Sequence, residues 1–155
     1  SVNFGKINSV GFLTNIKYTP TPSAFAYGVI NSFSLSYSYI NQDKEEENGI
    51  QSQYVLEYLK HKLTVNSEFR ITPKLSLTLL YRYQKRIGSY TVSEGIVKSY
   101  KPYGVLDSKI SYSLGNYLIY IEANNLLNTK YVDFGRIPQP RFWFIAGVSC
   151  NINWQ

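Results

Sequence analysis

Large apolar or aromatic side chains alternate with small polar ones along most of this 155-residue chain, and that period of two constrains its fold more than any other feature. Residues 32–39 read Ser-Phe-Ser-Leu-Ser-Tyr-Ser-Tyr, with serine at every second position. Near the other end, apolar side chains occupy alternate positions from Phe142 to Trp154. Successive side chains of a β-strand point to opposite faces. The pattern therefore predicts strands with one apolar and one polar face.

Five further segments alternate in the same way, which brings the expected number of strands to seven, with no helix. They lie at about 10–18, 60–71, 75–86, 107–114 and 117–124. The connections differ in length: tight turns are expected at 72–74 and 115–116, a Pro-rich connection at 19–27, and long polar loops at 42–53, 87–102 and 125–139. Tight turns join antiparallel strands, so the expected fold is all-β and antiparallel.

The chain carries few residues able to do catalytic or metal chemistry. Its one cysteine, Cys150, excludes an intrachain disulfide framework and a multi-cysteine metal site. Its one histidine, His61, excludes a histidine-pair metal site, and we expect it at the rim of the sheet. No Gly-rich phosphate loop, Ser/His/Asp set or catalytic carboxylate pair is recognisable. We therefore expect no enzyme activity, no metal and no cofactor.

The net charge of +6 raises the question of nucleic acid. Residues 81–86 interleave aromatic and basic side chains, as single-stranded nucleic-acid platforms do. On a strand, however, Tyr81 and Tyr83 face away from Arg82 and Arg86, so base stacking and phosphate contacts would fall on different sides. We expect no nucleic-acid partner. The positive charge suits equally well a surface surrounded by anionic lipopolysaccharide.

Two architectures fit alternating strands, and three features favour a membrane-embedded sheet over a soluble sandwich. Transmembrane β-strands need roughly 9–11 residues, a length that the expected strands reach. Transmembrane barrels combine short turns with long loops, and they carry aromatic girdles at both membrane interfaces. The aromatic residues that we expect near strand ends are Tyr18, Tyr39, Tyr81, Tyr83, Tyr117, Phe142 and Trp154.

We therefore expect the apolar face to meet lipid and the charged face to line a polar lumen. A charge buried in an apolar core costs on the order of several kcal/mol unless it is paired, whereas it costs little in a lumen filled by water or a plug. A membrane span leaves no backbone group unpaired, so the sheet is expected to close into a transmembrane β-barrel. The expected lumen-lining residues are Lys62, Glu68, Arg70, Arg82, Arg86, Asp107, Lys109 and Glu122.

The odd strand count indicates a barrel larger than this chain. Bacterial single-chain barrels have even numbers of strands. The chain begins at Ser1 and contains no methionine. If the last strand descends to the periplasm, Ser1 falls in an external loop, where proteases cut most readily. We expect residues 1–155 to be the C-terminal part of a larger barrel domain.

One block resembles a known family. The stretch Glu122-Ala-Asn-Asn125-Leu-Leu-Asn128-Thr-Lys-Tyr131 resembles the NLFN-x-x-Y signature before the last external loop of TonB-dependent outer-membrane receptors. A proline-containing segment and an aromatic closing strand follow, as in that family, and Tyr103-Gly-Val-Leu-Asp107 resembles the opening of an earlier family strand. The motif residues are Asn125, Leu126, Asn128, Tyr131, Pro138 and Pro140.

The resemblance implies a barrel of about 22 strands with a plugged lumen, in the outer membrane of a Gram-negative bacterium. Such receptors take up scarce bulky nutrients, such as cobalamin, iron–siderophore complexes or glycans, with energy supplied through TonB. The implied partners are the N-terminal remainder with its plug, TonB through that plug, outer-membrane lipid and lipopolysaccharide, and a surface lipoprotein. The external loops would bind the ligand, and our candidate contacts are Tyr100, Tyr103, Asp133 and Arg136.

Two other interpretations stay open at this point. The first is a soluble all-β module that binds an oligonucleotide or a carbohydrate. The second is a small membrane barrel that is complete by itself. Detergent dependence separates a soluble module from a membrane protein, and the number of strands separates a complete barrel from a part of one.

Overall fold

The computed structural model describes residues 6–21, 29–45, 58–92, 95–133 and 137–152. These residues form nine strands and no helix. The strands are β1 (Lys6–Tyr18), β2 (Val29–Glu45), β3 (Tyr58–Arg70), β4 (Leu75–Ile87), β5 (Ser89–Thr91), β6 (Val97–Ser99), β7 (Tyr103–Leu114), β8 (Tyr117–Asn124) and β9 (Trp143–Cys150). The prediction of an all-β antiparallel fold is confirmed.

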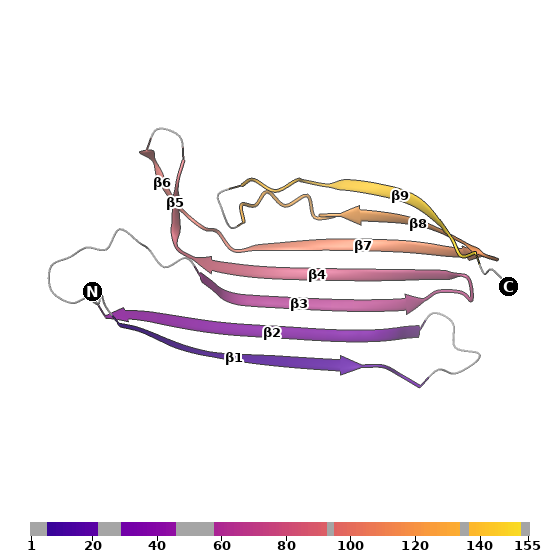
Figure 1. The fold of residues 1–155 in the computed structure, drawn as a ribbon, viewed down its shortest axis with the longest axis horizontal. Coiled ribbons are helices and arrows are strands. Elements are labelled where there is room, and N and C mark those ends of the chain that lie inside the picture. Colours follow the sequence, from indigo (N-terminus) through magenta and orange to yellow (C-terminus); the bar gives the residue numbers. More distant parts are fainter. Residues whose placement is uncertain (1–5, 22–28, 46–57, 93–94, 134–136, 153–155) are drawn as a thin grey trace.

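Seven of the strands form one sheet, in the order β1-β2-β3-β4-β7-β8-β9, so each strand pairs with its sequence neighbours in that sheet (Figure 1). Tight connections join β3 to β4 and β7 to β8 at what we call the turn end of the sheet. Gly115 takes a φ of 59° in the second of these turns, a conformation that glycine adopts without steric strain. At the opposite end, the loop end, β4 leads to β7 through the β5–β6 hairpin, and β8 leads to β9 through residues 125–142.

The strand register aligns the alternating side chains into rows across the sheet. Directly paired residues of antiparallel strands share a face. One row on the apolar face consists of Ile16, Leu35, Val65, Tyr81 and Leu106. A second row on that face consists of Phe69, Leu77, Ile110, Ile121 and Ala146. Most of the charged side chains lie on the other face, which we call the polar face.

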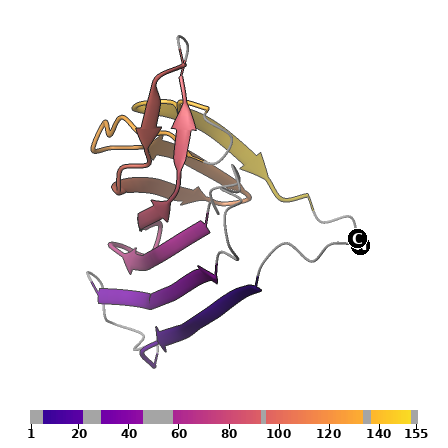
Figure 2. The same ribbon diagram turned by 90° about the vertical axis from the view of Figure 1, so that its left-hand side faces the viewer.

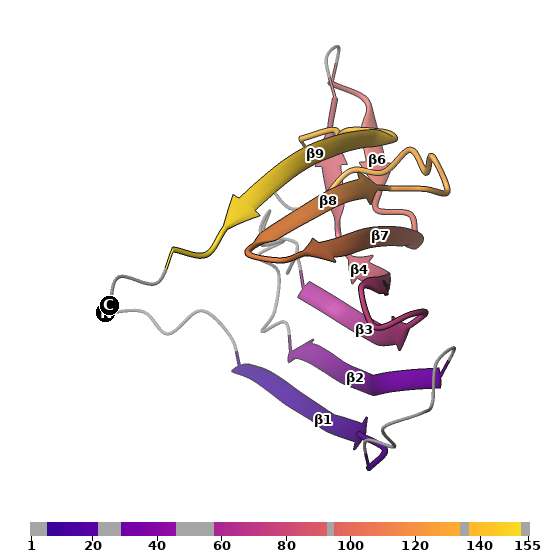
Figure 3. The ribbon, with the colours of Figure 1, turned by 90° about the vertical axis from the view of Figure 1, so that its right-hand side faces the viewer.

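The sheet is a single layer, and within the described part of the chain no second layer packs against its apolar face. Figures 2 and 3 show it nearly end-on, as a curved arc from which the β5–β6 hairpin projects. Only Tyr100 and Val105 are buried among the described apolar residues. Side chains on the apolar face remain widely exposed, for instance Val10 at 74 % and Phe144 at 67 %. A soluble domain normally packs such a face against a second layer.

The sheet is also open, since β1 and β9 are its edge strands and the described residues place no strand beyond either of them. The closed barrel that the sequence predicts is therefore not formed by these seven strands. An edge strand presents unpaired backbone N–H and C=O groups, which favour pairing with a further strand.

Several strand limits differ from those that alternation predicts. Residues 87–102 were expected to be a loop, but they contain the β5–β6 hairpin. Strand β2 continues through the polar residues to Glu45 because its backbone ladder with β1 continues there. Tyr39 therefore lies in the interior of β2. Tyr81 lies in the interior of β4, so the expected positions of both tyrosines near strand ends are wrong. Ser1 and Trp154 lie outside the described residues.

Candidate functional site

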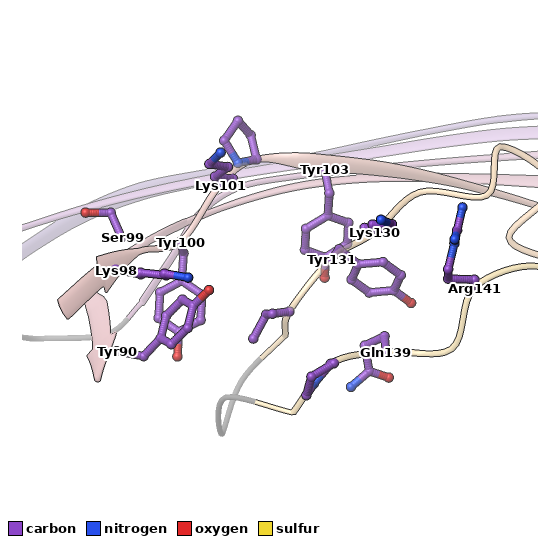
Figure 4. Close-up of a pocket in the computed structure, with 13 residues that line it drawn as sticks. Tyr90, Lys98, Ser99, Tyr100, Lys101, Tyr103, Lys130, Tyr131, Gln139 and Arg141 are labelled. Carbon is purple, nitrogen blue, oxygen red and sulfur yellow. The ribbon is translucent and has the colours of Figure 1, made fainter. Parts of the chain in front are cut away.

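A cavity of about 770 Å³ lies at the loop end, between the β5–β6 hairpin and residues 130–132 and 138–141. Figure 4 shows the side chains around it. They come from three segments that are far apart in sequence: the hairpin, the start of β7 and the segment after β8. The lining residues include Tyr90, Lys98, Tyr100, Lys101, Tyr103, Lys130, Tyr131, Gln139 and Arg141.

Asn125 shapes the segment after β8. Its φ is 53°, in the left-handed region that asparagine tolerates better than most residues. The side chain is buried, with 2 % of the residue exposed, and all its polar atoms are used. Its Nδ2 donates to the carbonyl oxygens of Thr129 at 2.9 Å and Pro140 at 3.2 Å, and its Oδ1 accepts from the Thr129 N–H at 2.9 Å. One side chain therefore joins the start of this segment to its end.

Asn128 closes the segment from the other side. It also has a left-handed backbone, with φ 52°, and its N–H donates to the Asn125 carbonyl oxygen at 2.8 Å. Its Oδ1 accepts from Arg141 Nε at 2.9 Å. The two asparagines of the motif are thus needed for both their backbone and their side chains. This local geometry explains why asparagine stands at positions 125 and 128 of a compact turn, and the explanation does not involve a ligand.

The same segment is attached to β7. The backbone N–H of Asn125 donates to Asp107 Oδ1 at 2.9 Å, and Thr129 Oγ1 donates to the Gly104 carbonyl oxygen at 2.8 Å. Further along, Gln139 N donates to the Tyr131 carbonyl oxygen at 3.0 Å, next to a bridge between Val132 and Pro138. These bonds hold Tyr131 beside the start of β7.

Two pairs of tyrosines form walls of the cavity. Tyr103 and Tyr131 stack with their ring centroids 4.3 Å apart, and Tyr90 and Tyr100 meet at 5.0 Å with an interplanar angle of 45° (Figure 4). Burial is the main cause that raises the pKa of the Tyr131 hydroxyl above its ordinary value; Arg82 lowers it, while Asp107 and Asp133 raise it. Tyr131 therefore presents a neutral hydroxyl and a ring face to a ligand at neutral pH.

The cavity lining carries positive charge. Its ionic side chains are Lys98, Lys101, Lys130 and Arg141, and no carboxylate is among the described lining residues. Beside the cavity, Arg86 Nη2 lies 3.2 Å from Asp133 Oδ1, and the Arg86 guanidinium stands 5.8 Å from the Tyr100 ring centroid. Flat aromatic walls with several cations suit a bulky ligand that carries anionic groups.

Of the four candidate ligand contacts, the structure brings Tyr100 and Tyr103 to the cavity. Asp133 lies beside it, in its pair with Arg86. Arg136 lies outside the described residues. Tyr90, Lys98, Lys130 and Arg141 were not among the candidates. The Arg141 position next to the motif could have indicated it, whereas Tyr90 and Lys98 depend on a hairpin that alternation did not predict.

The eight residues expected to line a lumen share the polar face, because the register places them in phase. Most are paired there. Arg82 Nη2 lies 2.8 Å from Asp107 Oδ2, and Lys109 Nζ lies 2.6 Å from Glu122 Oε1. Glu68 accepts hydrogen bonds from Asn31 and Ser32, and Arg86 pairs with Asp133; Lys62 and Arg70 are exposed.

A tyrosine and a glycine complete the pair of Lys109 and Glu122. Lys109 Nζ stands 4.4 Å from the ring centroid of Tyr120 on the polar face. The Tyr120 ring lies over Gly147 on β9, where an added Cβ would come within 2.5 Å of ring atoms. The missing side chain at position 147 thus leaves room for the ring to lie flat, in the arrangement known as aromatic rescue of glycine.

Comparisons with family models, with curated proteins and with solved structures find no match for this chain. No helix in the described ranges is long and apolar enough to cross a membrane. Among the described residues, no group of three or more His, Cys, Asp or Glu side chains could hold a metal ion. The class that the fold defines is an open antiparallel β-sheet with one apolar and one charged face.

Proposed function

We propose that this chain is the C-terminal wall of a TonB-dependent outer-membrane receptor that takes up a bulky nutrient. The observation that carries the proposal is the uncovered apolar face opposite a face of paired charges. Soluble monomers rarely expose a contiguous apolar patch larger than a few hundred Å². Here the apolar rows cross the sheet from β1 to β9 with no covering layer in the described chain.

Lipid acyl chains would cover that face, since they contact apolar side chains without requiring a complementary protein surface. The polar face fits the opposite environment, because its charges pair with each other or remain exposed. A transmembrane β-strand sheet must also have its edges paired. The open edges β1 and β9 would pair with strands from the remainder of the receptor, which gives the closed barrel that this chain lacks.

The cavity supports a role in ligand capture. It lies at the loop end of the sheet, where the long external loops of such a barrel would stand. Iron–siderophore complexes and cobalamin are the candidate ligands, both large enough to need the aromatic walls. The cationic lining favours a ligand that carries negative charge. Plug and TonB contacts would come from the N-terminal remainder.

The decisive experiment is purification of the protein from its native membranes in detergent, with the masses of all co-purifying species measured. A larger partner that stays with this chain, or the chain as part of one larger polypeptide, supports the proposal. A 17.8 kDa species that stays folded and monodisperse without detergent overturns it. That outcome would favour a soluble binding module instead.

A further inference from the structure

A group of basic and aromatic side chains interrupts the apolar face near the loop end of β2, β3 and β4. We name it the Tyr–His–Lys cluster, and it consists of Tyr37, Tyr39, Lys60, His61 and Lys85. The register puts Tyr39, His61 and Lys85 side by side in one row of the apolar face. The side chains in the rows toward the turn end are mostly aliphatic and aromatic, and none of those on β2, β3 and β4 is charged. The cluster is therefore a polar island at one level of an otherwise apolar surface.

A β-bulge builds this cluster. The register of β3 against β4 shifts between Leu59 and His61, so Lys60 is the extra residue. Regular alternation would send Lys60 to the polar face. Instead, its Nζ lies 6.0 Å from the ring centroid of Tyr39, on the apolar face. Bulges re-aim side chains in this way and are retained where that direction is useful.

Hydrogen bonding and ring packing hold the cluster in place. Tyr37 Oη and His61 Nδ1 are 2.8 Å apart, which occupies one ring nitrogen and leaves Nε2 to bind a further group. The rings of Tyr39 and His61 meet at 5.1 Å. Phe12 supports both tyrosines from β1, at 5.7 Å from Tyr37 and 5.8 Å from Tyr39.

Among the described residues, the charges in and around the cluster leave it cationic. Lys60 and Lys85 supply two ammonium groups. The carboxylate of Asp43 lies further toward the loop end of β2 on the same face, where Asn41 Nδ2 donates to both its oxygens at 3.2 Å. Ammonium groups, phenolic hydroxyls and an imidazole nitrogen together match a phosphate, which accepts several hydrogen bonds and carries negative charge.

We propose that the Tyr–His–Lys cluster binds the phosphate of a membrane lipid headgroup. The adjoining apolar rows decide between a lipid and a free phosphate. An acyl chain attached to the phosphate would extend toward the turn end, over the row of Leu35, Val65 and Tyr81. Because β2–β4 are interior strands of the sheet, further strands added at its edges would leave this surface uncovered. The inference rests on the proposed membrane location but not on the ligand of the cavity.

The test uses the complete protein, purified in detergent and placed in vesicles of phosphatidylethanolamine with a bisphosphorylated lipid A. Lipid that stays bound after re-extraction is counted by native mass spectrometry. The cluster variant is Lys60→Gln with Lys85→Gln. Its control, Lys62→Gln with Lys74→Gln, removes the same charge from the polar face and from a turn. A surface cation contributes about fivefold to binding an anionic lipid, so the cluster variant should bind about 30-fold more weakly than the control.

A second variant and a second lipid sharpen the result. Tyr37→Phe, which keeps the ring but removes the bond to His61, should weaken retention less than loss of both lysines. In vesicles with dephosphorylated lipid A, the retention of that lipid, counted by its mass, should not differ between cluster variant and control. Equal lipid retention by cluster variant and control, or displacement of the lipid by inorganic phosphate alone, would overturn the inference while leaving the proposed function standing. A protein soluble without detergent would overturn both.

Discussion

Asp107 accepts the backbone N–H of Asn125 at 2.9 Å with one carboxylate oxygen, while its other oxygen lies 2.8 Å from Arg82 Nη2. One residue on β7 therefore ties the charged polar face to the segment that frames the cavity. A change at Asp107 should affect both. Its two contacts can be separated experimentally because an amide can replace one function of the carboxylate and not the other.

Asp107→Asn keeps an oxygen that can accept from Asn125 but removes the charge opposite Arg82. Arg82 is 39 % exposed at its side chain, so solvent screens the pair, and we expect a loss of only about 1 kcal/mol in unfolding free energy. Asp107→Ala also deprives the Asn125 N–H of its acceptor and should cost about 2 kcal/mol. Unfolding in urea measures both. Equal losses for the two variants would contradict a separate role for the bond to Asn125.

Asn125→Ala should loosen the whole segment after β8. It removes three buried side-chain hydrogen bonds, at about 1 kcal/mol each, and places alanine at a φ that it disfavours. We expect faster tryptic cleavage after Lys130 and Arg141, with thermal unfolding as a second measurement. Asn116→Ala, in the exposed turn between β7 and β8, is the control and should leave cleavage unchanged.

Gly147→Val should displace the Tyr120 ring, since even a Cβ at this position would lie within 2.5 Å of it. The ring would leave Lys109, which now stands 4.4 Å from its centroid, and we expect a loss of about 2 kcal/mol from overpacking. A second change, Tyr120→Ala, should recover part of that loss by vacating the space. Additive losses in this double-mutant cycle would show that the contact does not matter.

Lys98→Gln with Lys130→Gln should weaken binding of an anionic ligand at the cavity. Both side chains line it, and each exposed cation should contribute less than about 1 kcal/mol, so a total loss of roughly fivefold to tenfold in Kd is expected. Raising the salt concentration should weaken the wild-type protein more than the variant. Titration with a negatively charged iron–siderophore complex measures this, with a neutral one as control.

The pH dependence of Tyr131 follows from the raised pKa of its hydroxyl. The folded protein favours the neutral phenol, so this stabilisation is fully present below the unfolded pKa of about 10 and is lost as pH rises through the folded value. We compare tyrosinate absorbance between wild type and Tyr131→Phe as the pH is raised. The contribution of Tyr131 should appear at a higher pH than that of exposed tyrosines. An ordinary midpoint for that contribution would contradict its burial.

Local patterns determined much of the fold. A period of two was enough to predict strands, their antiparallel order and the separation of apolar from charged faces, since adjacent side chains of a strand point in opposite directions. The two tight turns could be located from 72–74 and Gly115-Asn116. The motif at 125–131 identified a segment whose two asparagines turned out to have left-handed backbones.

Strand limits were harder to predict, because backbone pairing does not depend on side-chain polarity. Strand β2 continues to Glu45 because its backbone hydrogen bonds with β1 continue that far. Strands β5 and β6 pair although only three residues of each take part. For the same reason, only some residues of the candidate site could be predicted from the sequence. Tyr100 and Tyr103 were among the candidates, whereas Tyr90 and Lys98 reach the cavity only through the hairpin.

The sequence by itself thus determined which side chains share a face, because that depends only on the parity of their positions. Only the tertiary structure decided which of them meet. Strand register brought Lys109 to Glu122, and a single bulge turned Lys60 toward Tyr39, against its parity. These contacts depend on the register between separate strands, and the sequence of a single strand does not determine that register.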